Sequence, residues 1–294
     1  MQKFASTFSL TSLTLMLLLN SAYSMAQQNV NFWNGNKTES RQQYERNILK
    51  AALEASTQAH GDYTLSEDKS ELSSDEESAV FRDTNTDLFV TVAGNPKLKH
   101  EEKIIVTHPL MKGLLGYRLI IVRHHDLEKF AAIRKQGALK KLSVGIPEGW
   151  ADADLFRHNG FSVVEGGSFD EIFDLLAAKK FDYVSLGANE IEDVFKNRAE
   201  DSGMFNIEPT ILLYYPFALV FYIDPEKPEL AERLRDGLEA IERNGHAQRL
   251  FERATGNLIE RLELRSRKVF RLENPMLPPQ MREYRSTLLN QSVD

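Results

Sequence analysis

Two tryptophans stand at positions where they could hold a small ligand. Trp33 closes the first short β-prone run of the chain, and Trp150 lies between an apolar run and an amphipathic segment. In open α/β sheets, ligands bind beyond the carboxyl ends of the strands, so both indole rings are candidates for the walls of a cleft. Facing rings would bury an apolar or cationic part of the ligand. The alternative is that both tryptophans only pack between two parts of the fold.

Charged residues near these tryptophans limit the kinds of ligand that could bind there. Free backbone amides at the start of the helix expected after Trp150 would favour an anionic group. Asp152 and Asp154 add negative charge at the same place and oppose a purely anionic ligand. Arg118 lies in another apolar run, and two roles are open to it: contact with the ligand, or an ion pair between two parts of the fold.

Catalytic chemistry has little support in the sequence. The 294 residues include no cysteine, which excludes disulfides, thiolate metal sites and a cysteine nucleophile. The seven histidines are scattered without metal-ligand spacing. The sequence also has no Gly-x-Ser-x-Gly elbow, phosphate-binding loop or dinucleotide fingerprint. We therefore expect no enzyme activity, no cofactor and no metal site.

The charge of the chain is uneven. Its net charge of −7 argues against a nucleic-acid partner, because phosphate binding needs a clustered cationic surface. Residues 62–87 carry nine acidic side chains against two basic ones, whereas residues 249–285 carry nine basic side chains against five acidic ones. The overall charge therefore says nothing about the charge of a ligand.

The N-terminus has the layout of a secretory signal peptide. Lys3 precedes a short apolar run at 8–19, and small residues follow up to Ala26. The run is too short to span a bilayer, which takes about 20 residues. With residues 1–26 as signal peptide and no lipid-anchoring cysteine, we expect a soluble periplasmic protein.

The elements that must position the candidate residues alternate between strand and helix. Strands are predicted at 29–34, 63–65, 88–93, 103–107, 116–122, 142–146, 162–165 and 181–186. Helices are predicted after Ser40 and Ser168, which each begin a capping-box pattern, and at 151–158, 228–243 and 247–254. Such alternation predicts an α/β fold of two lobes, each a mostly parallel sheet with helices on both faces.

Two extended segments are expected to join the lobes as a hinge. The most apolar stretch after the signal peptide, at 210–223, is interrupted by Pro216 and reads as one long bent strand or two successive strands. The run at 116–122 is its counterpart. The first lobe is then expected to hold residues 27–118 plus 217–294, and the second lobe residues 119–216.

Several short motifs resemble one known family. They are Thr-His-Pro at 107–109, GLLGYR at 113–118, FDY at 181–183 and NPMLP at 274–278. Together with the order of the elements and the block at 142–190, they resemble a divergent subgroup of the family 3 periplasmic solute-binding proteins. The resemblance implies the type II periplasmic binding fold, in which two crossing strands join two lobes, and a role like that of amino-acid ABC transporter substrate-binding proteins.

The resemblance also implies where ligand anchors lie. Amino-acid binders of this family place an arginine just before the strand that ends in Thr-x-Pro, where its guanidinium grips the ligand carboxylate. Here the neighbourhood reads KLKHEE at 97–102, so Lys99 or His100 is expected in that role. The family's acidic anchor for the ligand ammonium corresponds here to Glu190, three residues after the expected place. Thr91 is a further candidate for contact with the ligand. The departures from the family's pattern at 97–102 and at Glu190 leave the identity of the ligand open.

The combined prediction is a periplasmic protein that captures a small polar, amino-acid-like ligand by hinge closure. Its partner would be a membrane permease of the ABC type. One alternative is a ligand sensor that signals to a membrane receptor, and a further one is an enzyme built on the same lobes. We expect a monomer.

Overall fold

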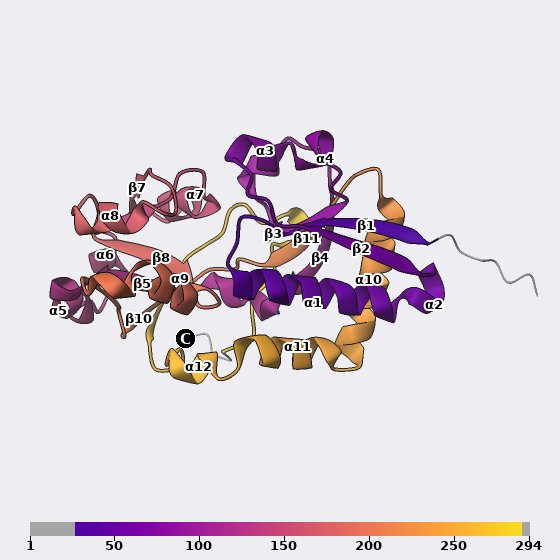
Figure 1. Cartoon of the computed structure of the whole chain (residues 1–294). Helices are drawn as coiled ribbons and strands as arrows, with labels where there is room; N and C mark the ends of the chain where they lie inside the picture. The colour runs from indigo at the N-terminus through magenta and orange to yellow at the C-terminus, as the bar shows by residue number, and fades with distance from the viewer. Residues whose placement is uncertain (1–26, 290–294) are drawn as a thin grey trace, which may run out of the picture.

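The computed structural model describes residues 27–289 and shows two lobes, each built on one β-sheet (Figure 1). The predicted signal peptide, residues 1–26, lies outside the described residues. Strands and helices alternate along the chain as predicted, and helices pack on both sheets. The prediction of a two-lobed α/β fold is confirmed.

The first lobe is built on a five-stranded sheet of order β2-β1-β3-β11-β4. Its strands are β1 (Gln28–Trp33), β2 (Tyr63–Asp68), β3 (Leu88–Val92), β4 (Ile104–Leu110) and β11 (Leu219–Ile223). β1 is parallel to β2 and β3, whereas β11 is antiparallel to β3 and β4. The carboxyl ends of β1 and β3 therefore meet at one edge of the sheet, and Trp33 and Thr91 lie there.

Three longer helices pack together on this sheet, and shorter helical turns join its strands. The helical elements of the lobe are α1 (Glu39–Ala55), α2 (Thr57–His60), α3 (Ser74–Ser78), α4 (Val80–Asp83), η1 (Pro96–Leu98), α10 (Pro228–Arg243) and α11 (His246–Thr255). The helix predicted after Ser40 is α1, and its residues Tyr44, Ile48 and Ala52, which recur at helical spacing, are buried. The acidic stretch at 62–87 forms β2 and the short helices α3 and α4.

The start of α1 differs from the prediction. The helix begins at Glu39, and its N-cap residue Thr38 makes no capping hydrogen bond through its side chain. The predicted capping box at Ser40 is therefore wrong, because Ser40 lies inside the first turn. Its hydroxyl instead donates to a carboxylate oxygen of Asp193 in the other lobe. A contact with a distant part of the chain has replaced the local cap.

The second lobe is built on a seven-stranded sheet of order β12-β10-β5-β8-β6-β7, with β9 also paired to β5. The strands are β5 (Tyr117–Arg123), β6 (Ser143–Ile146), β7 (Ser162–Glu165), β8 (Tyr183–Gly187), β9 (Phe205–Ile207), β10 (Ile211–Tyr214) and β12 (Lys268–Arg271). β6 is parallel to β7 and β8, but β5 is antiparallel to β8 and β10. Because β5 and β11 run against their neighbours, both sheets are mixed.

The remaining helical elements of the described chain are short. They are η2 (Met111–Gly116), η3 (His124–Asp126), α5 (Leu127–Ala131), α6 (Gln136–Leu139), α7 (Ala151–His158), α8 (Ile172–Ala177), α9 (Ile191–Arg198), η4 (Glu200–Ser202), α12 (Leu258–Arg261) and η5 (Pro279–Met281). The reciprocal hydrogen bonds predicted for the capping box at Ser168 are present, but α8 begins only at Ile172, with Glu171 as its N-cap residue. The backbone N–H of Ser168 donates to Glu171 Oε2 at 2.8 Å, and that of Glu171 donates to Ser168 Oγ at 3.3 Å.

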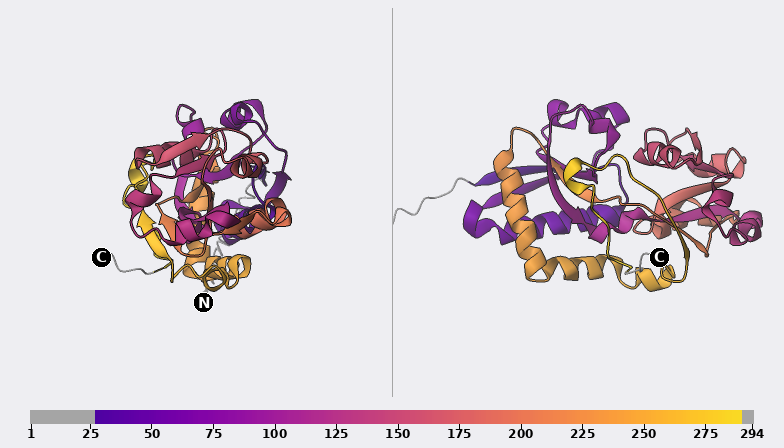
Figure 2. Two further views of the ribbon diagram at one scale, coloured as in Figure 1. Left: turned by 90° about the vertical axis from the view of Figure 1, so that its left-hand side faces the viewer. Right: turned by 180° about the vertical axis from the view of Figure 1, so that it is seen from behind.

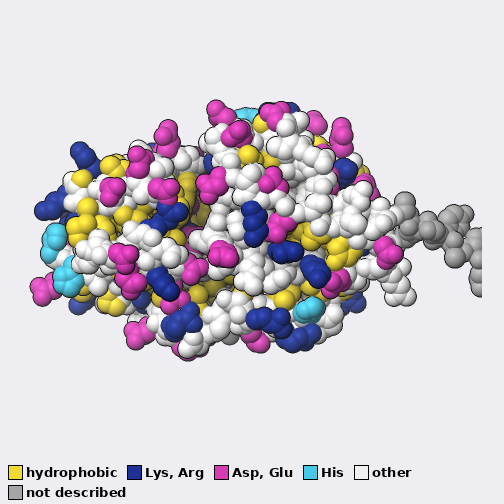
Figure 3. All heavy atoms as spheres, viewed as in Figure 1, with side chains coloured by type: hydrophobic (Ala, Val, Ile, Leu, Met, Phe, Trp, Pro, Cys, Tyr) yellow, Lys and Arg dark blue, Asp and Glu magenta, His cyan; other side chains and the backbone are white. Residues whose placement is uncertain are grey.

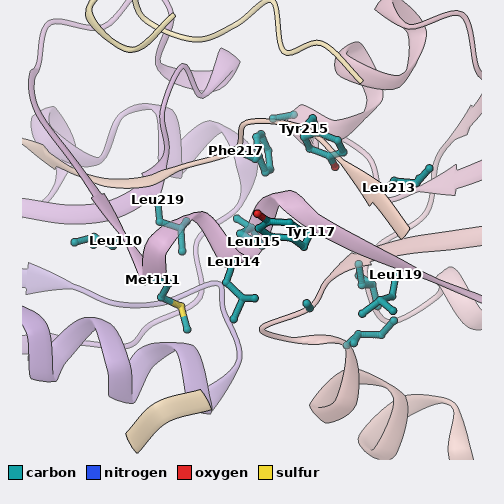
Figure 4. Close-up of a cluster of buried hydrophobic side chains, with 14 of the residues drawn as sticks. Leu110, Met111, Leu114, Leu115, Tyr117, Leu119, Leu213, Tyr215, Phe217 and Leu219 are labelled. Atoms are coloured by element: carbon teal, nitrogen blue, oxygen red, sulfur yellow. The ribbon is translucent and has the colours of Figure 1, made fainter. Parts of the chain in front are cut away.

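Two short segments carry the chain between the lobes. The first crossover, residues 111–116, joins β4 to β5, and the second crossover, residues 215–218, joins β10 to β11. The long apolar stretch is thus two strands in two different sheets, divided where Pro216 cannot donate a ladder hydrogen bond. The crossovers touch, because the backbone N–H of Tyr215 donates to the carbonyl of Gly116 at 3.1 Å. Figure 4 shows their buried side chains packed side by side.

The chain passes between the lobes again near its C-terminus. β12 pairs with β10 in the sheet of the second lobe, and residues 272–289 then return to the first lobe (Figure 2). The expected boundary placed all of residues 217–294 in the first lobe, and β12 departs from it. β12 has only four residues and lies between two basic, irregular segments, so the sequence shows too little periodicity to predict it. Its pairing depends on the tertiary fold.

Replacing glycine by alanine is predicted to have opposite effects on stability at two helical positions. A Cβ at Gly237 of α10 would overlap the backbone carbonyl of Ala52 on α1, whereas a Cβ at Gly137 of α6 meets no atom within 4 Å. Gly237→Ala should lower the free energy of unfolding by about 1–3 kcal/mol through overpacking. Gly137→Ala should raise it by up to about 1 kcal/mol, because alanine favours the helix. Urea denaturation of both variants checks this, and equal effects would contradict it.

Candidate functional site

A cavity of about 920 Å³ lies between the two lobes, within the size range of small-molecule sites. Figure 3 shows the hollow between the lobes, with hydrophobic side chains at its base. The first lobe contributes the segment 33–41 and residues 89–92. The second lobe contributes residues 148–152, residues 168–170 and part of α9. The site therefore exists only where the two lobes meet.

The lobes approach each other closely around this cavity. Ser40 on α1 donates its hydrogen bond to Asp193 on α9. Gly149 of the second lobe lies close to Ser74 of the first, since a Cβ at position 149 would be 3.4 Å from Ser74 Oγ. The cleft is thus bridged by contacts between side chains and backbone of the two lobes.

The wall of the first lobe carries two cations that share one buried carboxylate. Lys37 Nζ lies 2.7 Å from Glu45 Oε2, and Arg41 Nε lies 2.6 Å from Glu45 Oε1. Glu45 is completely buried behind the wall, and Lys37 and Arg41 line the cavity. Burial lowers the pKa of Lys37, and the charge of Glu45 opposes this shift. Two positive charges on one negative charge give this cluster an excess of positive charge.

A second polar cluster in the same lobe is electrically balanced. Lys97 Nζ lies 2.7 Å from Glu77 Oε2. Asn95 Nδ2 donates to Thr91 Oγ1 at 2.9 Å and to Glu77 Oε1 at 3.3 Å. These four residues line the cavity, and together they add no net charge to it.

A cluster on the wall of the second lobe has the opposite balance. Arg118 Nη2 lies 2.7 Å from Asp152 Oδ1, and Arg118 Nη1 lies 3.6 Å from Glu190 Oε1. Arg118 is only 1% exposed, and the hydroxyl of Tyr215 from the second crossover donates to Asp152. Burial raises the pKa of Tyr215 well above its usual value, which keeps its hydroxyl a donor. One cation between two carboxylates leaves an excess of negative charge.

Both tryptophans line the cavity, one from each lobe. The indole of Trp33 is 3% exposed, donates from Nε1 to the carbonyl of Ser70 at 3.0 Å and packs against Phe89. The ring of Trp150 is half-buried, and its centroid lies 5.1 Å from that of Phe169. Trp33 is therefore a fixed part of the wall, while Trp150 presents more of its surface.

Five of the seven residues singled out in the sequence line this cavity. They are Trp33, Thr91, Arg118, Trp150 and Glu190. Of the two roles open to Arg118, the structure shows an ion pair, but within the second lobe rather than between the lobes. Glu190 also accepts a hydrogen bond from the backbone N–H of Gly187 at 3.0 Å.

Lys99 and His100 do not line the cavity and are exposed to solvent. The turn η1 buries Leu98 in the core and brings Lys97 onto Glu77, so the two following side chains lie outside. The expectation that one of them anchors a carboxylate therefore does not fit the geometry.

Sequence reasoning missed Lys37, Arg41 and Glu45. A recognisable signal was present, because Arg41 and Glu45 are four residues apart on a helix and so lie on one face. Lys37 precedes that helix and reaches Glu45 only because the chain bends after β1. Among the described residues no cluster of three or more His, Cys, Asp or Glu could hold a metal ion. No helix within residues 27–289 has the length and apolarity to cross a membrane.

The buried pair in the second lobe predicts a large effect on stability. Arg118→Met should lower the free energy of unfolding by about 3–5 kcal/mol, because Asp152 and Glu190 would stay buried without their cation. Arg157→Met is the matched control, because Arg157 pairs with Glu165 but is 46% exposed, and it should cost at most about 1 kcal/mol. Urea denaturation measures both, and a loss below about 1 kcal/mol for Arg118→Met would contradict the role given to this pair.

Comparisons with known proteins place this geometry in context. No protein-family model and no curated protein sequence matches the chain. Its likeness to solved structures, in contrast, extends over most of the described residues.

Three solved structures illustrate the likeness. A probable amino-acid ABC transporter extracellular-binding protein from Bacillus subtilis has a TM-score of 0.56 at 13% identity, covering 79% of this chain and 99% of its own. An amino acid ABC transporter substrate-binding protein from Streptococcus pneumoniae, bound to L-arginine, has a TM-score of 0.54 at 13% identity over 77% and 93%. The VFT2 domain of BvgS from Bordetella pertussis has a TM-score of 0.54 at 16% identity over 76% and 92%. The chain thus has the two-lobed fold of amino-acid ABC transporter substrate-binding proteins, as its motifs predicted, at a sequence identity that shows the fold alone.

Proposed function

We propose that this chain captures a small zwitterionic ligand of the amino-acid type between its lobes and holds it by hinge closure. The observation that carries the proposal is the opposite charge of two clusters, one on each wall of the cleft. The first lobe presents Lys37 and Arg41 around one carboxylate, and the second lobe presents Asp152 and Glu190 around one guanidinium.

A ligand with one positive and one negative group matches both walls only when they face each other across it. Its carboxylate would lie toward Lys37 and Arg41, and its ammonium group toward Asp152 and Glu190. Charge-assisted hydrogen bonds of this kind are stronger than neutral ones. Because the ligand touches both lobes only when they are close, it favours the closed arrangement over the open one.

The remaining lining residues would hold the rest of such a ligand. Trp33 and Trp150 offer aromatic surface for an apolar or cationic side chain. Thr91 offers its hydroxyl, and Arg118 fixes the two carboxylates beside it. Lys99 and His100 have no part in this arrangement.

Transport is the role we favour for the captured ligand. The predicted signal peptide supports export to the periplasm, and a monomer would deliver the ligand to an ABC-type membrane permease. The likeness to substrate-binding proteins of amino-acid transporters supports this role. Closure without covalent chemistry is sufficient for it, so no enzyme activity is proposed.

Sensing is the second candidate, and it rests on the likeness to the BvgS domain and to a histidine kinase sensor domain. In that role, closure would change a surface read by a membrane receptor. A permease and an ATPase encoded beside this gene would support transport, and a membrane sensor encoded there would support sensing.

Binding can be followed without a label, because both tryptophans of the chain line the cleft. In a screen of the twenty amino acids, at least one should change the tryptophan fluorescence and raise the melting temperature. A ligand at 100 times its Kd adds about 2.7 kcal/mol to the stability of the folded state. The N-acetyl and amide derivatives of the hit should bind at least about tenfold more weakly, since each lacks one charge. Absence of any response to free amino acids and short peptides would contradict the proposal.

Single variants of the two walls test the charge assignment. Lys37→Met should weaken binding of the hit by about 10- to 100-fold and spare its amide, which has no carboxylate to lose. Glu190→Gln should weaken the hit similarly and spare its N-acetyl derivative. Glu128→Gln on the exposed surface of α5 is the control and should bind as the natural chain does. Equal weakening of all three compounds by both variants would refute the assignment.

A further inference from the structure

The C-terminal strap, residues 272–289, lies beside the two crossovers. It starts at the end of β12 in the second lobe and runs past both crossovers to the first lobe (Figure 2). No predicted role of the chain uses it, although it contains the NPMLP motif at 274–278.

The strap is fastened to both lobes. At its start, Asn159 of the second lobe donates from Nδ2 to the carbonyl of Glu273 at 2.7 Å and accepts from its N–H at 2.8 Å. Further along, Leu277 and Met281 are buried in a core cluster of the first lobe that includes Trp33. A segment attached to both lobes in this way resists a change in the angle between them.

The strap also binds the second crossover. Asn274 Nδ2 donates to the carbonyl of Pro216 at 2.8 Å. On the other side of Pro216, the hydroxyl of Tyr215 donates to Asp152 in the cleft wall. The second crossover is thus held between the ligand-facing wall and the strap.

The first crossover is bound by the other end of the strap. Ser286 Oγ donates to the carbonyl of Lys112 at 2.6 Å, and the backbone N–H of Ser286 donates to the hydroxyl of Tyr214 at 2.9 Å. Met111, Lys112 and Gly113 all have positive φ, at 49°, 51° and 72°. Two of these are not glycine, so the backbone here is strained and persists only where neighbouring contacts hold it. The hydrogen bond from Ser286 is such a contact.

We propose that the C-terminal strap sets the resting angle of the hinge by stabilising the arrangement in which the lobes touch at Ser40 and Asp193. Opening the cleft requires the crossovers to change conformation, and the strap hydrogen bonds to Pro216 and Lys112 must loosen as they do. This inference rests on the proposed function only in that the cleft must open to admit a ligand. The strap thereby regulates how often the site is accessible.

The test measures the distance between the lobes without any ligand. The chain has no cysteine, so Glu71→Cys and Asn197→Cys place two spin labels on exposed residues on opposite sides of the cavity. Double electron–electron resonance then gives the distribution of distances between the labels. In this background, Asn274→Ala combined with Ser286→Ala should raise the population of longer distances at least about tenfold, because each lost hydrogen bond favours the open state.

Controls separate the strap from general loosening. Ser286→Ala alone removes one hydroxyl and should shift the distances in the same direction by a smaller amount, so it serves if the double variant folds poorly. Arg282→Ala with Arg285→Ala changes exposed strap residues and should leave the distribution unchanged. An unchanged distribution in both test variants would overturn the proposal, as would an equal shift in the arginine control. Because no ligand is present, the outcome is independent of whether the cleft binds amino acids.

Discussion

The buried ion pair between Arg118 and Asp152 joins three parts of the molecule that must keep their places together. Arg118 lies on β5 directly after the first crossover, and Asp152 lies on α7 in the cleft wall. Tyr215 of the second crossover donates its hydroxyl to the same carboxylate. A charge that is this deeply buried is tolerated only with its partners in position. The cleft wall and both crossovers are therefore fixed by one small network.

The need of a buried charge for a partner also explains how charged residues are arranged along the whole cleft. The buried or half-buried cations that line it, Lys37, Arg41, Lys97 and Arg118, each lie against a carboxylate. Each lobe satisfies its buried charges internally, so neither wall depends on the other for its structure. What remains is a small charge excess of opposite sign in one cluster on each wall, around Glu45 and around Arg118. A hinged site needs such independence, because its walls separate whenever it opens.

The strands and longer helices were predictable because their signals are local. Alternation of short apolar runs with amphipathic segments indicated the two-lobed α/β fold, and Pro216 indicated the break between β10 and β11. The hydrogen bonds of the capping box at Ser168 formed as its spacing predicted, since all their atoms lie within four residues, although α8 itself begins only at Ile172. The one at Ser40 did not, because Asp193 in the other lobe offered its hydroxyl a partner that no local pattern contains.

The sequence by itself determined most of the elements, their order and the aromatic residues at the ends of strands, because periodicity and strand ends are properties of neighbouring residues. It did not indicate β9, β12 or α9. Only the tertiary structure decided which charges meet. It turned Lys97 rather than Lys99 or His100 toward the cleft, brought Lys37 onto Glu45, and set β12 beside β10. Such pairings depend on where distant segments come together, and burial then selects the partners, since an unpaired charge cannot remain inside.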